Sequence, residues 1–113
     1  MADFQKSIGE FTARNAAVVA ASVDGLEDAR KTIARHGLTF PVAFGLEARD
    51  VSAKTGAFFQ KERGSLHATG FIIRRDGTLA HAVYSTGAIG RLVAADCIEV
   101  VDYYARKPWV RTT

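Results

Sequence analysis

The stretch "VVAASVDGLEDARKTIARHGLTFPVAFG", residues 18–45, decides the fold. The stretch begins inside a continuous apolar run, residues 16–23. Such a run is typical of a strand buried on both faces of a sheet. After Asp24 and Gly25, apolar residues recur at helical spacing, with Asp24 as the expected N-cap and Gly37 as the C-terminal stop. The face that this helix is expected to bury contains Leu26, Ala29, Ile33 and Ala34. Strand and helix in this order favour an α/β fold.

A second short strand is expected over residues 38–45, where Pro41 lacks a backbone donor and therefore belongs near a sheet edge. A short helix over 47–56, closed by Gly56, and an irregular loop over 57–66 follow it.

Helical periodicity also marks both ends of the chain. Phe4, Ile8 and Phe11 recur at intervals of three and four residues, which predicts an amphipathic helix over residues 3–14. Apolar residues recur in the same way over 91–106, and Pro108 marks the end of that helix.

The clearest local signal is "ATGFIIRRDGTLAHAVYS", residues 68–85. Two extended runs meet across Asp76 and Gly77, a favoured hairpin turn, so antiparallel pairing is expected. The whole order predicts a mixed sheet covered by helices, an α/β sandwich in which residues 1–107 form one domain and 108–113 a tail.

Composition limits the classes of function. The formal net charge is +3, but basic and acidic residues are interleaved, so no nucleic-acid partner is expected. No run approaches the roughly 20 apolar residues that span a bilayer, and no leader pattern is present, so we expect a cytoplasmic protein without a membrane partner. One cysteine and three scattered histidines predict no internal disulfide, no metal site and no cofactor.

The stretches 18–45 and 69–92, "TGFIIRRDGTLAHAVYSTGAIGRL", resemble parts of a peroxiredoxin of the alkyl hydroperoxide reductase and thiol-specific antioxidant family. The resemblance extends from about Ala2 to Tyr104 and implies an N-terminally truncated, thioredoxin-like three-layer sandwich with a mixed sheet. It also implies redox, antioxidant ancestry and an oxidoreductase activity that needs a reactive thiol.

This sequence departs from the family pattern in two places. The strand and cysteine loop that would precede the helix at about Asp3 are absent, and the arginine that the family places before the first hairpin strand matches Ala68. His67 is adjacent to Ala68, but its imidazole is not equivalent to the forked hydrogen-bond donor of an arginine guanidinium. We therefore expect the chain to lack peroxidase activity by itself; the alternative is a non-catalytic binding or assembly module.

Cys97 is the one free thiol, and it is expected in the middle of the last helix, between Ala94 and Val101. Structural packing in the core is the favoured interpretation, and no catalytic residue is assigned. A resolving or sensing cysteine is the alternative, which requires a lowered pKa.

Three segments are expected to meet at one end of the sheet, which we call the mouth: residues 22–24, 67–69 and 86–88. The hairpin strands run in opposite directions, so its turn must lie at the far end. The expected binding residues are Asp24, His67, Thr69, Thr86, Gly87 and Ala88.

The missing strand leaves the middle of the expected sheet open. One solution is direct antiparallel pairing of residues 17–23 with 70–75. Another, which we favour, is a homodimer formed by strand pairing or element exchange. A third is an upstream segment that carries the thiol.

Overall fold

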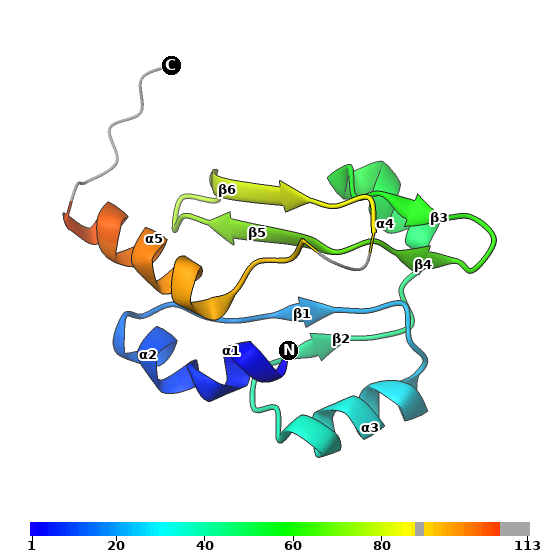
Figure 1. The fold of residues 1–113 in the computed structure, drawn as a ribbon, viewed down its shortest axis with the longest axis horizontal. Coiled ribbons are helices and arrows are strands. Elements are labelled where there is room, and N and C mark those ends of the chain that lie inside the picture. The colour runs from blue at the N-terminus through cyan, green and yellow to red at the C-terminus, as the bar shows by residue number, and fades with distance from the viewer. Residues whose placement is uncertain (88–89, 107–113) are drawn as a thin grey trace.

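The computed structural model of the 113-residue chain describes residues 1–87 and 90–106. Pro108, the expected tail 108–113 and Ala88 of the expected site lie outside these residues. Helices and strands follow in the order α1 (Ala2–Lys6), α2 (Ile8–Ala13), β1 (Ala20–Ala21), α3 (Leu26–His36), β2 (Val42–Ala43), α4 (Ala48–Thr55), β3 (Phe59–Gln60), β4 (Ser65–Leu66), β5 (Thr69–Ile73), β6 (Leu79–Tyr84) and α5 (Ala94–Arg106). The mixed α/β architecture is confirmed (Figure 1). No described helix has the length and hydropathy that a membrane span requires.

Glycines end the helices α3 and α4 as the sequence predicts. Gly37 and Gly56 adopt left-handed backbone angles, with φ of 59° and 81°. The predicted N-cap of α3 is wrong, because Gly25 occupies that position and Asp24 lies one residue before it. The backbone of Asp24 is engaged elsewhere: its N–H donates to Ser22 Oγ over 3.0 Å and its carbonyl accepts from Gly45 N–H over 2.6 Å.

The expected amphipathic face of α3 is only partly buried. Ala29 is 4% exposed, whereas Leu26 is 41% exposed and Ala34 is also exposed. Leu26 stands at the first residue of the helix, where the chain has only just left the sheet.

The helix expected over residues 3–14 is divided at Ser7 into α1 and α2. Hydrogen bonds from Ser7 N–H to Phe4 O (3.2 Å) and from Glu10 N–H to Ser7 O (3.0 Å) span three residues and tighten the turn between them. Phe4 and Phe11 still stack, with ring centroids 5.8 Å apart. The apolar stripe therefore survives the break in the helix.

The β5–β6 hairpin is confirmed, with Thr69 opposite Tyr84 and a bulge between Ile72 and Ile73. Its turn has Gly77 at φ 88°, and Asp76 Oδ1 accepts from Thr78 N–H over 2.9 Å. Residues 57–66 are not wholly irregular, because β3 and β4 pair within them. Gly64, at φ 62°, lies in the turn that joins these two strands. The residues around it are polar, so the sequence shows no strand pattern that would predict this hairpin.

The described strands form three separate two-stranded sheets, β1–β2, β3–β4 and β5–β6. β1 and β2 are parallel and are joined through α3. Direct pairing of residues 17–23 with 70–75 is therefore wrong. The expected burial of both faces of the first strand is wrong as well, since Val19 is 69% exposed. Among the strands of residues 1–87 and 90–106, β1 pairs only with β2.

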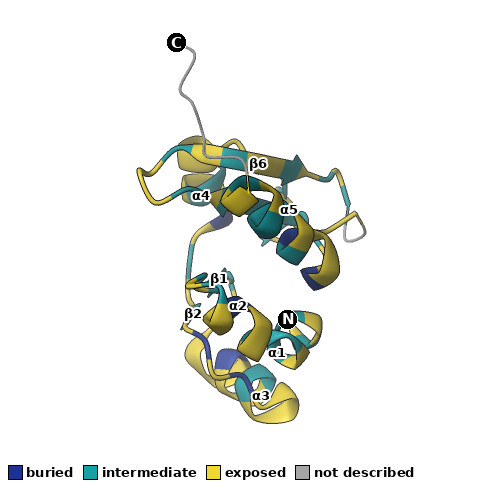
Figure 2. Cartoon of the chain, turned by 90° about the vertical axis from the view of Figure 1, so that its left-hand side faces the viewer, coloured by how far each residue is buried: buried dark blue, intermediate teal, exposed yellow. Residues whose placement is uncertain are grey.

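The core joins the two ends of the chain. Phe11, Ala94 and Cys97 are buried together, and the partly buried residues against them are Phe4, Ala16, Val18, Ile72, Leu92 and Ile98. Figure 2 shows how few positions are buried, with exposed residues covering most of α3.

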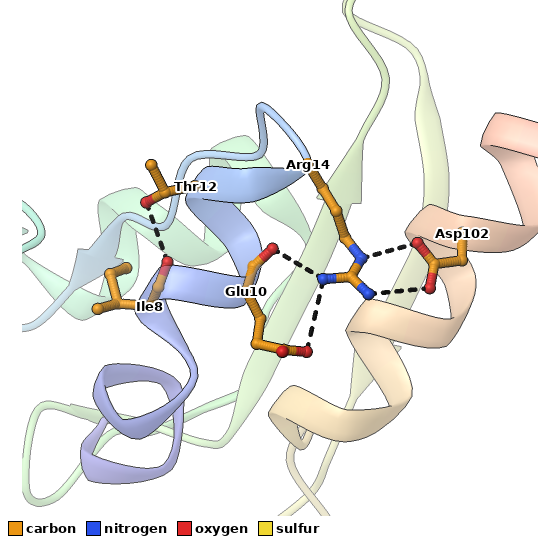
Figure 3. A network of polar contacts seen from close by, with 5 residues as sticks. All are labelled: Ile8, Glu10, Thr12, Arg14 and Asp102. Carbon is orange, nitrogen blue, oxygen red and sulfur yellow. Dashed lines mark hydrogen bonds and ion pairs between the residues drawn. The ribbon is translucent and has the colours of Figure 1, made fainter.

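A forked ion pair ties α2 to α5 beside this core (Figure 3). Arg14 at the end of α2 donates from Nε to Asp102 Oδ1 over 2.7 Å and from Nη2 to Oδ2 over 3.2 Å. Its Nη1 donates to the carbonyl of Glu10 over 3.0 Å, so the guanidinium is held from two sides. These hydrogen bonds lower the pKa of Asp102 and raise that of Arg14.

Candidate functional site

Cys97 lies in the first turn of α5 rather than in the middle of a helix, because that helix begins at Ala94 and not near Arg91. Its N–H is already bonded, as expected, and donates to Val93 O over 3.2 Å. The side chain is only 5% exposed and packs with Phe11 and Ala94. The thiol is therefore placed in the apolar core.

The surroundings of Cys97 favour the protonated thiol. Burial raises its pKa above the ordinary 9.0, and the nearby carboxylates of Asp96 and Asp3 raise it further. Asp3 is fixed there because its Oδ2 accepts from Ala94 N–H over 2.7 Å and so caps α5. A helix N-terminus normally favours a thiolate. At Cys97, burial comes first among the causes that raise the pKa, followed by the charges of Asp96 and Asp3.

We expect folded Cys97 to react with iodoacetamide at least about 100-fold more slowly than the unfolded chain, because the buried sulfur must first be exposed by an opening of the fold. The free energy of unfolding should also fall above about pH 9, where the unfolded chain releases the thiol proton and the folded protein retains it. Urea unfolding between pH 7 and 10.5 measures this slope. Cys97→Ala is the control, and an equal slope in both proteins would contradict the raised pKa.

Hydrogen bonds bring two of the three mouth segments together. Ala68 N–H donates to Gly87 O over 3.0 Å, and Ser85 N–H donates to Ala68 O over 2.9 Å. His67 is half buried, and its backbone N–H donates to Phe58 O. Thr69 Oγ1 donates to His67 O over 3.1 Å. His67, Thr69, Thr86 and Gly87 thus lie on adjacent segments.

The third mouth segment, residues 22–24, is hydrogen-bonded to residues 45 and 46 and not to the other two segments. Gly45 N–H donates to Asp24 O, and Leu46 N–H donates to Ser22 O over 3.2 Å. No described hydrogen bond or ion pair connects Asp24 with the segments 67–69 or 85–87. Figure 1 shows the end of β1, the start of β5 and the end of β6 on the same side of the molecule. Asp24 follows β1 in the chain, but it does not join the bonded pair of segments.

An open depression that no sequence pattern indicates lies at Val23, the residue before Asp24. Its lining comes from the chain after β1, the start of α4 and the β3–β4 hairpin, and consists of Val23, Gly45, Leu46, Glu47, Ala48, Arg49, Phe59, Lys61 and Gly64. Arg49 and Lys61 contribute two cationic side chains against the one carboxylate of Glu47. Residues so far apart in the chain share no local motif.

The donor set for a metal ion is missing from the described part of the chain, residues 1–87 and 90–106. Within it, no group of three or more histidine, cysteine, aspartate or glutamate residues is arranged to hold a metal ion.

The fold identifies the class of protein. A parallel strand pair joined by a helix, an antiparallel hairpin and a closing helix build a thioredoxin-like α/β fold, and solved peroxiredoxin structures share it. The protein matches AhpC of Mycobacterium bovis with a TM-score of 0.74 at 22% identity, and a cysteine-to-serine mutant of peroxiredoxin 6 of Arenicola marina with a TM-score of 0.72 at 18% identity.

The particular family follows from the sequence model of the AhpC/TSA family, which matches residues 1–82. The chain belongs to the AhpC/TSA family and is a thioredoxin-fold protein of redox ancestry. The matches cover 99% of this chain but only 62% of the AhpC chain and 57% of the peroxiredoxin 6 chain. A search among curated proteins found no match.

Proposed function

We propose that this chain has no thiol peroxidase activity by itself, although its fold and family are those of peroxiredoxins. The observation that carries the proposal is the burial of Cys97, the one sulfhydryl in the sequence, with a pKa raised by its surroundings. A thiol attacks peroxide as the thiolate, which a buried site beside two carboxylates disfavours.

The surroundings of Ala68 support the same proposal. The family resemblance places a thiolate-stabilising arginine at this position, and alanine supplies no side-chain donor. Both backbone groups of Ala68 are used in the hairpin, by Gly87 and Ser85. A peroxide oxygen at this point would meet no forked cation from residue 68.

We expect the purified chain to consume hydrogen peroxide with a thiol reductant no faster than the reductant alone. Cys97→Ser is expected to give the same background rate, since the sulfur takes no part. Peroxide consumption followed by a colorimetric assay measures both. Turnover that disappears in Cys97→Ser would contradict the proposal and would make Cys97 the nucleophile.

The second candidate function is a non-catalytic binding or assembly module that uses the mouth. The hydrogen bonds between residues 68 and 87 support it, because they give His67, Thr69, Thr86 and Gly87 a fixed backbone. The end of β1 lies on the same side of the molecule (Figure 1), and Val23, the residue before Asp24, lines the depression that contains Arg49 and Lys61. Such a module would bind a partner without any peroxide turnover.

We also propose a homodimer formed through exposed strand edges. β6 is the longest strand, and among the described strands it pairs only with β5. The backbone groups of successive residues in β6 point to opposite edges of the strand. The N–H and C=O groups of Ala82 therefore point away from β5, whereas those of Val83 and His81 point toward it. Two copies of β6 can pair antiparallel about a two-fold axis.

We also propose a cytoplasmic location for the protein, because a single unpaired cysteine suits that reducing compartment.

Light scattering is expected to give a dimer for the parent chain and a monomer for Ala82→Pro. Proline removes one outward donor of β6 and leaves the hydrogen bonds to β5 in place. Far-ultraviolet circular dichroism checks that the variant keeps its fold. A parent chain that stays monomeric at every concentration would exclude this assembly.

A further inference from the structure

Three segments of the chain meet in the depression at the start of α4. They are residues 45–49, the β3–β4 hairpin, and Val23 after β1. Figure 1 shows α4, β3 and β4 together at one end of the molecule, and α4 contacts both strands. The depression has a volume of about 430 Å³, which lies within the range of small-ligand sites. It is therefore large enough for a small organic molecule.

Backbone hydrogen bonds fix the segments that form the depression. Gly45 N–H donates to Asp24 O over 2.6 Å, which holds the chain before α4 to the chain after β1. On the hairpin side, Gly64 N–H donates to Gln60 O over 2.9 Å and closes the turn between β3 and β4. Both sides of the depression are therefore ordered before a ligand arrives, which lowers the entropy cost of binding.

Two cationic side chains of the lining take part in no ion pair of the described chain. Within residues 1–87 and 90–106, the ion pairs leave both Arg49 and Lys61 unpaired. Glu47, the one carboxylate of the lining, lies within ion-pair distance of neither cation. The lining therefore keeps two positive charges against one negative charge, and it favours an anionic ligand.

The first turn of α4 adds backbone donors to these two cations. Ala48 is the first residue of the helix, lines the depression and is 4% exposed. Glu47 at the N-cap makes no side-chain capping bond, and within residues 1–87 and 90–106 the N–H groups of Ala48 and Arg49 have no acceptor. A buried donor without an acceptor is costly, so an oxygen atom of a ligand is favoured here.

We propose that the depression binds a small phosphomonoester that carries an aromatic group. A doubly charged phosphate matches two cations and the backbone donors of Ala48 and Arg49, whereas a carboxylate brings only one negative charge. The half-buried ring of Phe59, on the hairpin side of the lining, offers an apolar face to an aromatic group. This inference rests on the binding module proposed above, because it names a ligand for that function.

Titration of the isotope-labelled chain with phenyl phosphate, followed by the amide signals in nuclear magnetic resonance spectra, tests the proposal. We expect the amide signals of Ala48 and Arg49 to shift until the site is saturated, while those of α3 stay in place. Methyl phosphate carries the same charge without the ring. We expect it to bind about three- to tenfold more weakly than phenyl phosphate, the usual value of one aromatic contact.

Charge variants of the lining are expected to change the affinity in opposite directions. Arg49→Gln and Lys61→Gln should each weaken the binding of phenyl phosphate by about three- to tenfold, because each removes a charged donor. Glu47→Gln should tighten it by about two- to fivefold, because it removes the negative charge of the lining. Damage to the fold would not tighten binding. Phe59→Leu should remove the preference for phenyl phosphate over methyl phosphate.

The matched controls are Lys31→Gln and Arg35→Gln, which remove the same two kinds of charge from exposed positions of α3 outside the lining. We expect both to keep the affinity of the parent chain. Circular dichroism checks that every variant folds. If Phe59→Leu unfolds, the comparison of phenyl phosphate with methyl phosphate on the parent chain still measures the contribution of the ring.

Several outcomes would overturn the inference. Equal weakening by the α3 variants means a general attraction to positive charge, and unchanged or weaker binding by Glu47→Gln means that the phosphate lies elsewhere. Equal binding of the two phosphate esters removes the aromatic group from the ligand class. Amide shifts confined to residues 67–69 overturn the inference but leave the binding module at the mouth. No shift at any amide with millimolar phenyl phosphate rejects this ligand class for both.

Discussion

Replacing Phe11 with alanine is expected to lower the free energy of unfolding by about 3–5 kcal/mol, the usual cost of emptying a buried aromatic site. Phe11 is 4% exposed and belongs to the cluster that packs α2 against α5. It also stacks on Phe4. Its removal leaves a cavity where the two ends of the chain meet. Urea unfolding, followed by circular dichroism, measures the loss.

Phe44→Ala is the matched control, because Phe44 is 49% exposed and lies outside the core cluster. It removes the same aromatic ring, yet we expect it to cost less than about 1 kcal/mol, as is usual for surface substitutions. Equal losses in the two variants would mean that the contact between α2 and α5 does not carry the stability of the fold.

The features that were predictable from sequence are those with local causes. The stops at Gly37 and Gly56 follow from the left-handed backbone that glycine tolerates, and the β5–β6 turn follows from Asp76 and Gly77. The apolar stripe of Phe4 and Phe11 also formed, although a tight turn at Ser7 interrupts its helix. Each of these signals is complete within about a dozen residues.

The features that were wrong in the prediction depend on distant partners. The apolar run before Asp24 predicts a strand buried on both faces, but burial also needs elements packed over both faces, and Val19 is 69% exposed in the structure. The start of α5 at Ala94 is set by a carboxylate from Asp3, 91 positions away in the chain. No periodicity reports such a contact. That contact is also what brings a second negative charge near Cys97.

The candidate site was likewise predictable only in part. Topology alone predicted that the segments around His67 and Gly87 lie side by side, and the hydrogen bonds at Ala68 bear out that juxtaposition. The binding role of these residues stays a prediction. The depression that contains Arg49 and Lys61 was missed, because its lining comes from separate loops whose meeting no local pattern encodes.

Gly70→Val is expected to lower the free energy of unfolding by about 1–3 kcal/mol, the usual cost of overpacking a filled site. A Cβ atom on Gly70 would lie 2.5 Å from Leu92 Cδ1 and 2.9 Å from Leu92 Cγ, closer than non-bonded carbons approach. Leu92 cannot simply move away, since it packs against the core cluster ahead of α5. Thermal or urea unfolding measures the loss.

Two further variants separate a clash at Gly70 from a general effect of losing a glycine. Gly9→Ala adds a Cβ atom where no heavy atom lies within 4 Å, inside α2, and should stabilise the protein by up to about 1 kcal/mol through helix propensity. Combining Gly70→Val with Leu92→Ala should cost less than the sum of the single changes, because the shorter side chain makes room for the new methyl groups. Additive losses in the double variant would show that Leu92 is not the residue that Gly70 accommodates.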